Sequence, residues 1–259
     1  MTDSQRLLGV YGRLYAAYGP QRWWPGESPF EVIVGAVLTQ SAAWTNVEKA
    51  IANLKAAGAL SPEGLARTDE GELARMVYPA GYFNAKARKL KAFVGMLDGS
   101  FGGDPSTPLR TGLERMLAAP VEELRPLLLA THGIGPETAD AILLYAAGRP
   151  VFVIDAYTRR LFARLGIAPE RDTYEAWQAL FARNLEPDAA LFNEYHALIV
   201  RHGKERCRRL PVCGGCPLLA VCPTGREGWP PSPGRPGLSL TFERETRPKR
   251  KVRFRSDRT

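Results

Sequence analysis

Apolar residues recur with the period of an amphipathic helix along most of this sequence. Apolar positions at i, i+3, i+4 and i+7 occur in SPFEVIVGAVLTQ, WTNVEKAIANLKAAG, NAKARKLKAFVGMLDG, PVEELRPLLLATHG, PETADAILLYAAG, DAYTRRLFARLG and TYEAWQALFARNL. Only PVFVID at residues 150–155 resembles a strand, and it is too short to found a sheet. We therefore expect an all-α fold.

Helix-end signals bound several of these segments. Ser28 before Pro29 predicts a helix start, and so does Asp172 with Glu175 three residues later. Glycines predict helix ends, because they adopt the left-handed conformation that closes many helices; they are Gly58, Gly133 and Gly148.

A short turn at residues 131–136 separates two of the expected helices. One helix ends near Thr131, Gly133-Ile134-Gly135 forms the turn, and Pro136 suits the first turn of the next helix. The glycines allow close backbone approach, and the opening helix offers free N–H groups to a phosphate. The same residues also occur in helical hairpins that serve only for packing.

All four cysteines of the chain lie within residues 207–222, with the spacing C-x5-C-x2-C-x5-C. The chain has no apolar run long enough for a membrane helix and no signal-peptide core, so we expect a cytoplasmic protein without membrane attachment. A reducing compartment disfavours disulfides and favours a metal site. The spacing favours an iron–sulfur cubane over structural zinc or free thiols, which both stay open.

The formal net charge of +8 is concentrated near the C-terminus. Residues 223–259 hold ten Lys and Arg against four Asp and Glu, and they are rich in proline and glycine. We expect residues 226–259 to form a flexible basic tail, in which Arg247 to Arg258 bind phosphates. A solvated tail without a partner is the alternative.

The order of five motifs resembles the endonuclease III branch of the helix-hairpin-helix DNA glycosylases. The motifs are LTQ at 38–40, GYFNAKA at 81–87, GIGPETA at 133–139, VID at 153–155 and the cysteine cluster, and the resemblance covers residues 5 to about 223. It implies a [4Fe-4S] cluster on Cys207, Cys213, Cys216 and Cys222. The family's usual first spacing is C-x6-C, so this cysteine loop is one residue shorter.

The resemblance also implies two helical domains flanking a DNA-binding groove. A six-helix barrel domain with the hairpin would span 25–149, and an iron–sulfur domain would combine 1–24 with 150–225. The implied partner is double-stranded DNA containing damaged bases, bound by a monomer at the nucleoid.

Two carboxylates carry the expected chemistry. Asp155 matches the family's catalytic aspartate, and its place before a helix favours the ionised form, although a plain N-cap is the default for such a residue. Glu137 stands eighteen residues earlier, where bifunctional relatives have a lysine nucleophile. A carboxylate cannot form a Schiff base, so we expect a monofunctional enzyme.

Aromatic residues suggest the substrate. Trp23, Trp24 and Trp44 flank the first expected barrel helix, and this region most resembles 3-methyladenine DNA glycosylases. Indole faces suit cationic alkylated purines such as 3-methyladenine and 7-methylguanine, although each tryptophan could equally be a packing residue. Mismatched, oxidised or deaminated bases are alternative substrates, and a non-catalytic lesion-binding protein is a further alternative.

The remaining expected site residues contact DNA. Gln40 and Tyr82 match family residues that enter the duplex, and helix-end packing is the alternative for both. The other expected DNA contacts are Gly133, Gly135 and Thr138 of the hairpin and Arg208 and Arg209 of the cysteine loop. His132 is expected to be a turn residue, and Lys86, Arg88 and Lys89 are expected to form a basic face that contacts solvent or phosphates.

Overall fold

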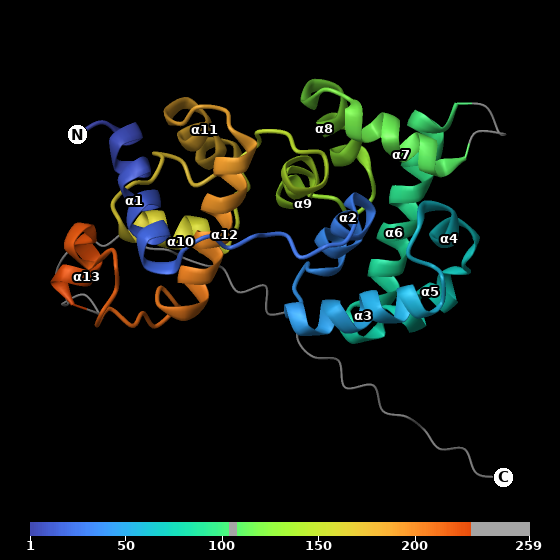
Figure 1. The fold of residues 1–259 in the computed structure, drawn as a ribbon, viewed down its shortest axis with the longest axis horizontal. Coiled ribbons are helices and arrows are strands. Elements are labelled where there is room, and N and C mark those ends of the chain that lie inside the picture. Colours follow the sequence, from blue (N-terminus) through green and yellow to red (C-terminus); the bar gives the residue numbers. More distant parts are fainter. Residues whose placement is uncertain (104–107, 229–259) are drawn as a thin grey trace, which may run out of the picture.

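The computed structural model describes residues 1–103 and 108–228, and this part of the chain is helical without any strand (Figure 1). The all-α prediction is confirmed. The basic segment Arg247 to Arg258 lies outside the described residues. No helix within them has both the length and the apolar character needed to cross a bilayer.

The helices form two groups that lie side by side (Figure 1). One group holds α2 (Pro29–Leu38), α3 (Trp44–Ala56), α4 (Pro62–Arg67), α5 (Glu70–Met76), η1 (Tyr78–Ala80), α6 (Phe83–Leu97), η2 (Asp98–Gly102), α7 (Leu109–Ala118), α8 (Val121–Ala130), α9 (Pro136–Ala141) and η3 (Ile142–Ala146). The other holds α1 (Asp3–Tyr18), α10 (Ala156–Arg164), α11 (Tyr174–Asn184), α12 (Ala189–Glu205), η4 (Leu219–Val221) and α13 (Pro223–Glu227). The N-terminal helix therefore packs with the C-terminal third of the chain.

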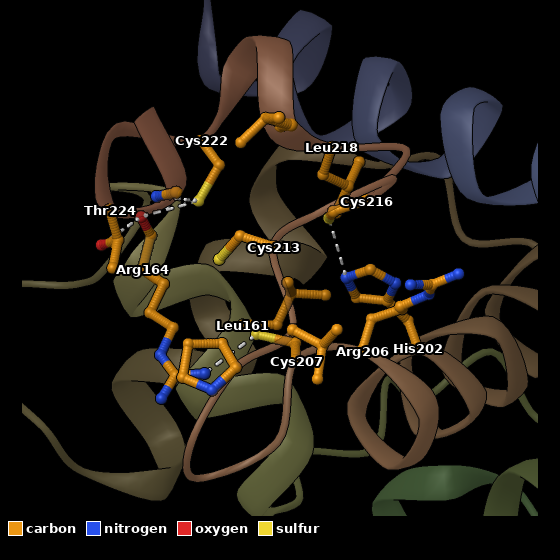
Figure 2. Close-up of a pocket in the computed structure, with 14 residues that line it drawn as sticks. Leu161, Arg164, His202, Arg206, Cys207, Cys213, Cys216, Leu218, Cys222 and Thr224 are labelled. Carbon is orange, nitrogen blue, oxygen red and sulfur yellow. Dashed lines mark hydrogen bonds between the residues drawn. The ribbon is translucent and has the colours of Figure 1, made fainter. Parts of the chain in front are cut away.

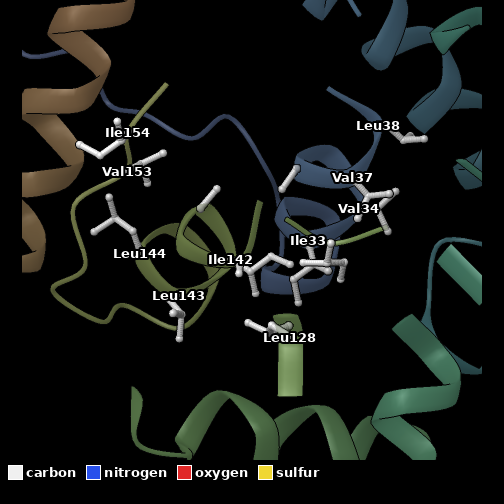
Figure 3. Close-up of a cluster of buried hydrophobic side chains, with 14 of the residues drawn as sticks. Ile33, Val34, Val37, Leu38, Leu128, Ile142, Leu143, Leu144, Val153 and Ile154 are labelled. Carbon is white, nitrogen blue, oxygen red and sulfur yellow. The ribbon is translucent and has the colours of Figure 1, made fainter. Parts of the chain in front are cut away.

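Helix α2 lies at the centre of the first group because its sequence is apolar on every side. Every residue from Phe30 to Leu38 is buried. A helix that is hydrophobic all round must be surrounded by other elements. Figure 3 shows Ile33 of α2 facing Ile142 of η3 and Leu128 of α8.

The predicted helix starts are confirmed in one case and wrong by one residue in the other. The Ser28 hydroxyl accepts a hydrogen bond from the backbone N–H of Glu31, as an N-cap does. Thr173, and not Asp172, caps α11. The Asp172 carboxylate instead accepts hydrogen bonds from the side chains of Trp177 and Arg159.

The predicted hairpin connects α8 to α9. Gly133 has a φ of +80°, which a residue with a side chain rarely adopts. Gly135 is the N-cap of α9 and Pro136 is its first residue. Residues 150–155 form no strand, and the described residues offer them no partner strand.

A buried carboxylate fastens the second hairpin helix to its neighbours. Asp140 of α9 is fully buried and accepts hydrogen bonds from Arg125 of α8, at 2.7 Å, and from Gln178 of α11, at 2.6 Å. Removing one partner of a buried ion pair leaves an uncompensated charge. Asp140 therefore fixes the hairpin against helices of both groups.

Lys86 does not belong to the predicted basic face. Its side chain is 2% exposed, and its ammonium group donates to the carbonyls of Leu38 and Ala80, both at 2.7 Å. Burial, reinforced by nearby Lys89, lowers the pKa of Lys86 to about 8. Lys86 satisfies a carbonyl at the C-terminal end of α2 and ties it to the turn before α6.

We predict that Lys86→Ala lowers the free energy of unfolding by about 2–4 kcal/mol, because it leaves two buried carbonyls without donors. Urea unfolding followed by circular dichroism measures this loss. Arg88→Ala on the exposed face of the same helix is the matched control and should change stability by less than about 0.5 kcal/mol. Equal effects of the two substitutions would contradict the assigned role of Lys86.

Candidate active site and cysteine cluster

A cavity of about 1010 Å³ is lined by residues of both helix groups. Its walls come from the segment before α2, the loop between α2 and α3, the hairpin helix α9 with η3, the start of α10, one face of α12, and the segment that follows α12. The predicted site residues that line it are Trp23, Trp24, Gln40, Trp44, Glu137, Thr138, Asp155, Arg208 and Arg209. Residues distant in the sequence are thus brought to one place.

Asp155 is the N-cap of α10 and is almost fully buried, with 8% exposure. Its Oδ1 accepts a hydrogen bond of 2.7 Å from the backbone N–H of Thr158, and its Oδ2 lies 3.6 Å from Nε2 of His196. Burial alone would raise the pKa of Asp155. The effects of His196 and Thr158 outweigh burial, so the pKa lies below its ordinary value and the carboxylate is ionised at neutral pH.

Glu137 lies in the first turn of α9 and lines the same cavity. The cavity leaves its side chain accessible, while the surrounding walls shield it from bulk water. This burial, together with the negative charge of Asp155, raises the pKa of Glu137. The two carboxylates therefore differ in their affinity for a proton, with Asp155 the stronger acid.

Three tryptophans form an aromatic wall. The ring centroids of Trp23 and Trp44 lie 6.0 Å apart, and each lies 5.4 Å from that of Trp24. A Cβ on Gly35 of α2 would lie only 3.2 Å from the Trp24 ring, so this glycine makes room for the indole. The indole nitrogens of Trp23 and Trp24 are buried and have no hydrogen-bond partner within the described residues.

One face of α12 forms the opposite wall and was not predicted. His196, Val200, Gly203 and Lys204 are spaced i, i+4, i+7 and i+8, and all four line the cavity. The Lys204 ammonium lies 5.9 Å from the centroid of the Trp23 ring. The spacing was visible in the sequence, but nothing in it distinguished this face from the buried face of an ordinary helix.

Gln40 is held against the hairpin by its side-chain amide. The amide nitrogen donates to the Gly133 carbonyl at 3.1 Å and to the Thr138 hydroxyl at 2.9 Å, while the amide oxygen accepts a hydrogen bond from Lys89. Gln40 thereby links the α2–α3 loop to the hairpin. Tyr82 is separate from this network: it is 75% exposed and has a left-handed backbone with a φ of +46°.

The cysteines line a second cavity, which Figure 2 shows between α10, the end of α12 and the loop leading to α13. Cys207, Cys213, Cys216 and Cys222 all contribute to its walls, and none forms a disulfide. Among the described residues, no group of three or more His, Cys, Asp or Glu side chains is arranged to hold a metal ion.

Hydrogen-bond donors face three of the four sulfurs. Arg164 donates to Sγ of Cys207 at 3.2 Å, and the backbone N–H of Gly225 donates to Sγ of Cys222 at 3.3 Å. The Nε2 atom of His202 lies 3.8 Å from Sγ of Cys216 (Figure 2). Burial raises the pKa of the Cys216 and Cys222 thiols, so their deprotonation calls for a positive partner.

Residues 34–187 match the HhH-GPD family, described as HhH-GPD superfamily base excision DNA repair protein. A protein of Methanocaldococcus jannaschii that carries the name of a DNA repair glycosylase is 41% identical over 84% of this chain and 96% of its own length. Endonuclease III of Sulfolobus acidocaldarius is 26% identical over 74% of this chain and 81% of its own length.

Solved structures show the same fold. The H. pylori 3-methyladenine DNA glycosylase MagIII bound to 1,N6-ethenoadenine matches with a TM-score of 0.63 and 28% identity, over 79% of this chain and 98% of that chain. An endonuclease III trapped in a covalent intermediate with DNA matches with a TM-score of 0.71 and 20% identity, over 88% and 99%.

Proposed function

The chain belongs to the HhH-GPD superfamily of base excision DNA repair glycosylases, and within it we propose a monofunctional enzyme that removes alkylated purines such as 3-methyladenine and 7-methylguanine. The observation that carries this proposal is the aromatic wall of three tryptophans in the same cavity as one ionised carboxylate. The similarity to the H. pylori 3-methyladenine DNA glycosylase supports it.

The aromatic wall suits a flat, positively charged base. Methylation at N3 or N7 leaves a purine cationic, and an indole face attracts a cation through its ring quadrupole. Stacking and cation–π attraction together contribute about 1–3 kcal/mol.

Asp155 acts on the sugar. As the cationic base leaves, positive charge develops at the sugar carbon, and an ionised carboxylate stabilises that charge and orients the attacking water. The N-cap hydrogen bond fixes Oδ1 and leaves Oδ2 on the side of His196. Little acid catalysis is needed at the base, because alkylation has already weakened the glycosidic bond.

Glu137 makes the enzyme monofunctional. No amine is available at this position to attack the sugar, because Glu137 carries a carboxyl group. Water is then the nucleophile in the hydrolysis of the glycosidic bond.

Four of the proposed duplex contacts line the cavity, namely Gln40, Thr138, Arg208 and Arg209. Arg208 and Arg209 provide cationic groups for phosphates, and Gly133 and Gly135 allow the backbone to approach the DNA closely. Gln40, held by Thr138, and the exposed Tyr82 enter the duplex when the damaged base is extruded. In this arrangement the DNA lies between a domain of residues 25–149 and a domain formed by 1–24 and 150–225.

We propose that the four cysteines are the ligands of a [4Fe-4S] cluster. Their side chains line one cavity. Arg164 and the backbone N–H of Gly225 donate to two of the sulfurs, and His202 lies near a third. Such surroundings suit thiolates better than neutral thiols. The cluster would cross-link the cysteine loop and so hold Arg208 and Arg209 in place. No step of base removal passes through it.

We predict that the purified protein releases free 3-methyladenine and 7-methylguanine from duplex DNA treated with dimethyl sulfate, measured by chromatography of the released bases. Asp155→Asn should lower the rate at least about 100-fold while DNA affinity changes little, because the carboxylate acts on developing charge.

Trp24→Ala tests the base specificity within the same assay. It should reduce release of cationic methylpurines about 5- to 100-fold and affect a neutral base such as uracil less, whereas Trp24→Phe should retain most activity. Equal losses for cationic and neutral bases would refute the stacking argument. Efficient release of mismatched thymine or uracil without release of methylpurines would replace the proposed substrate.

We predict that base release occurs without strand cleavage. The alkylated duplex should stay intact until alkali or an abasic-site nuclease is added, and borohydride should trap no enzyme–DNA adduct. Glu137→Lys, which supplies an amine, is the informative comparison, and Glu137→Gln is the control without one. A strong adduct with the unmutated protein would show that another amine attacks the sugar.

We predict that the anaerobically purified protein is yellow-brown and contains about four iron and four acid-labile sulfide per chain. Cys213→Ser should lower the iron content and weaken DNA binding together, because the same loop carries Arg208 and Arg209. Stoichiometric zinc without iron would overturn the cluster assignment.

A further inference from the structure

His196 contacts two side chains of the cavity wall that are both distant from it in the sequence. Its Nδ1 lies 2.5 Å from the Tyr145 hydroxyl of η3, and its Nε2 lies 3.6 Å from Oδ2 of Asp155. The imidazole is 6% exposed, and Nε2 has no hydrogen-bond partner among the described residues. The one polar atom of the ring without such a partner therefore faces the proposed catalytic carboxylate.

The Tyr145 contact bears on which nitrogen of a neutral imidazole carries the proton, because the phenol can donate to Nδ1 or accept from it. Burial, with a contribution from Asp155, raises the pKa of Tyr145 well above its ordinary value, so the phenol keeps its proton. A phenol that donates to Nδ1 leaves the ring proton on Nε2. The N–H group then lies on the side of Asp155.

We propose that His196 is a positioning residue for Asp155: held at Nδ1 by the Tyr145 hydroxyl, it presents an Nε2–H group that favours the ionised carboxylate and orients its Oδ2. Asp155 is thereby held from two sides, with the Thr158 amide at Oδ1 and the imidazole at Oδ2. The inference rests on the proposed catalytic role of Asp155.

Other charged groups face Asp155 as well. Glu137 of α9 lines the same cavity and disfavours a second negative charge, while Arg160 and Lys204 line it with positive charges. Arg160 is already engaged with the Cys207 carbonyl at 2.8 Å, and Lys204 lies near the Trp23 ring. Unlike these side chains, His196 directly contacts the Asp155 carboxylate.

The test measures the pKa of the Asp155 carboxylate in the absence of DNA. Carbon-13 NMR of protein labelled at the aspartate carboxyl carbons gives the pKa of Asp155, with Asp155→Asn to assign the signal. His196→Leu removes the N–H group while the Asp155 carboxylate stays buried, so the pKa of Asp155 should rise. His196→Gln, whose amide can present an N–H group at the same end, should restore part of the difference.

Tyr145→Phe tests the contact between the Tyr145 hydroxyl and Nδ1 of His196. Without the phenol, Nδ1 can carry the ring proton and Nε2 then turns a lone pair toward Asp155. Nitrogen-15 NMR of the histidines should show the Nε2–H form of His196 in the unmutated protein and a shift toward the Nδ1–H form in the variant. Tyr11→Phe, which removes a phenol outside the cavity, is the matched control.

Activity provides the second readout. Base release requires the carboxylate form, so its rate falls as pH falls through the pKa of Asp155. In His196→Leu this fall should begin at higher pH. The maximal rate should drop about 10- to 100-fold, by analogy with the loss of a residue that hydrogen-bonds to a metal-binding side chain and orients it. Affinity for a duplex with a tetrahydrofuran abasic site should stay within about twofold of that of the unmutated protein, because the substitution does not remove a contact that binds the DNA in the ground state.

The outcomes separate the inference from the proposed function. An unchanged Asp155 pKa in both His196→Leu and Tyr145→Phe, or an Nδ1–H tautomer in the unmutated protein, would overturn the inference. Retained base release in Asp155→Asn would overturn the catalytic role of Asp155, while the NMR titration would still decide whether His196 controls the carboxylate. If His196→Leu fails to fold by circular dichroism, Tyr145→Phe decides the result.

Discussion

A buried carboxylate that stays ionised requires compensation from its surroundings, and the arrangement of the cavity follows from that requirement. Burial alone would make Asp155 a weaker acid. The fold supplies the compensation from separate elements: the first turn of α10 gives the backbone N–H of Thr158, and α12 brings His196. Helix α12 can approach α10 because Gly203 has no side chain, since a Cβ there would lie 2.4 Å from the Tyr157 ring.

Helix α12 also relates the two cavities to each other. His196 faces the large cavity, whereas His202 lies near Cys216, and Cys207 follows the end of the helix after two residues. Arg160 reaches from the wall of the large cavity to the Cys207 carbonyl. A change in the cysteine loop would therefore be transmitted to α12 and α10 by packing and hydrogen bonds. The proposed cluster then has a structural route to the proposed DNA-binding residues without any chemical role.

Local signals in the sequence predicted the local features of the fold. Ser28 caps a helix and Gly133 adopts a positive φ because these preferences depend on a few neighbouring residues. The assignment of Asp172 as a cap was wrong because Thr173 competes for the same role one residue later. Lys86 was wrongly assigned to a basic surface, because its hydrogen bond to the carbonyl at the end of α2 depends on tertiary contacts that the local sequence does not reveal. His196 and Tyr145 were not predicted, since 51 residues separate them and neither belongs to a motif.

The two carboxylates of the cavity need not act against each other. Glu137 takes up a proton more readily than an ordinary glutamate because it is shielded by the cavity walls and lies near Asp155. The lowered pKa of Asp155 and the raised pKa of Glu137 make Asp155 the stronger acid, so Asp155 keeps its negative charge in preference to Glu137. In the proposed reaction, the negative charge that faces a developing sugar cation is therefore held first by Asp155, while Glu137 offers no amine to attack the sugar.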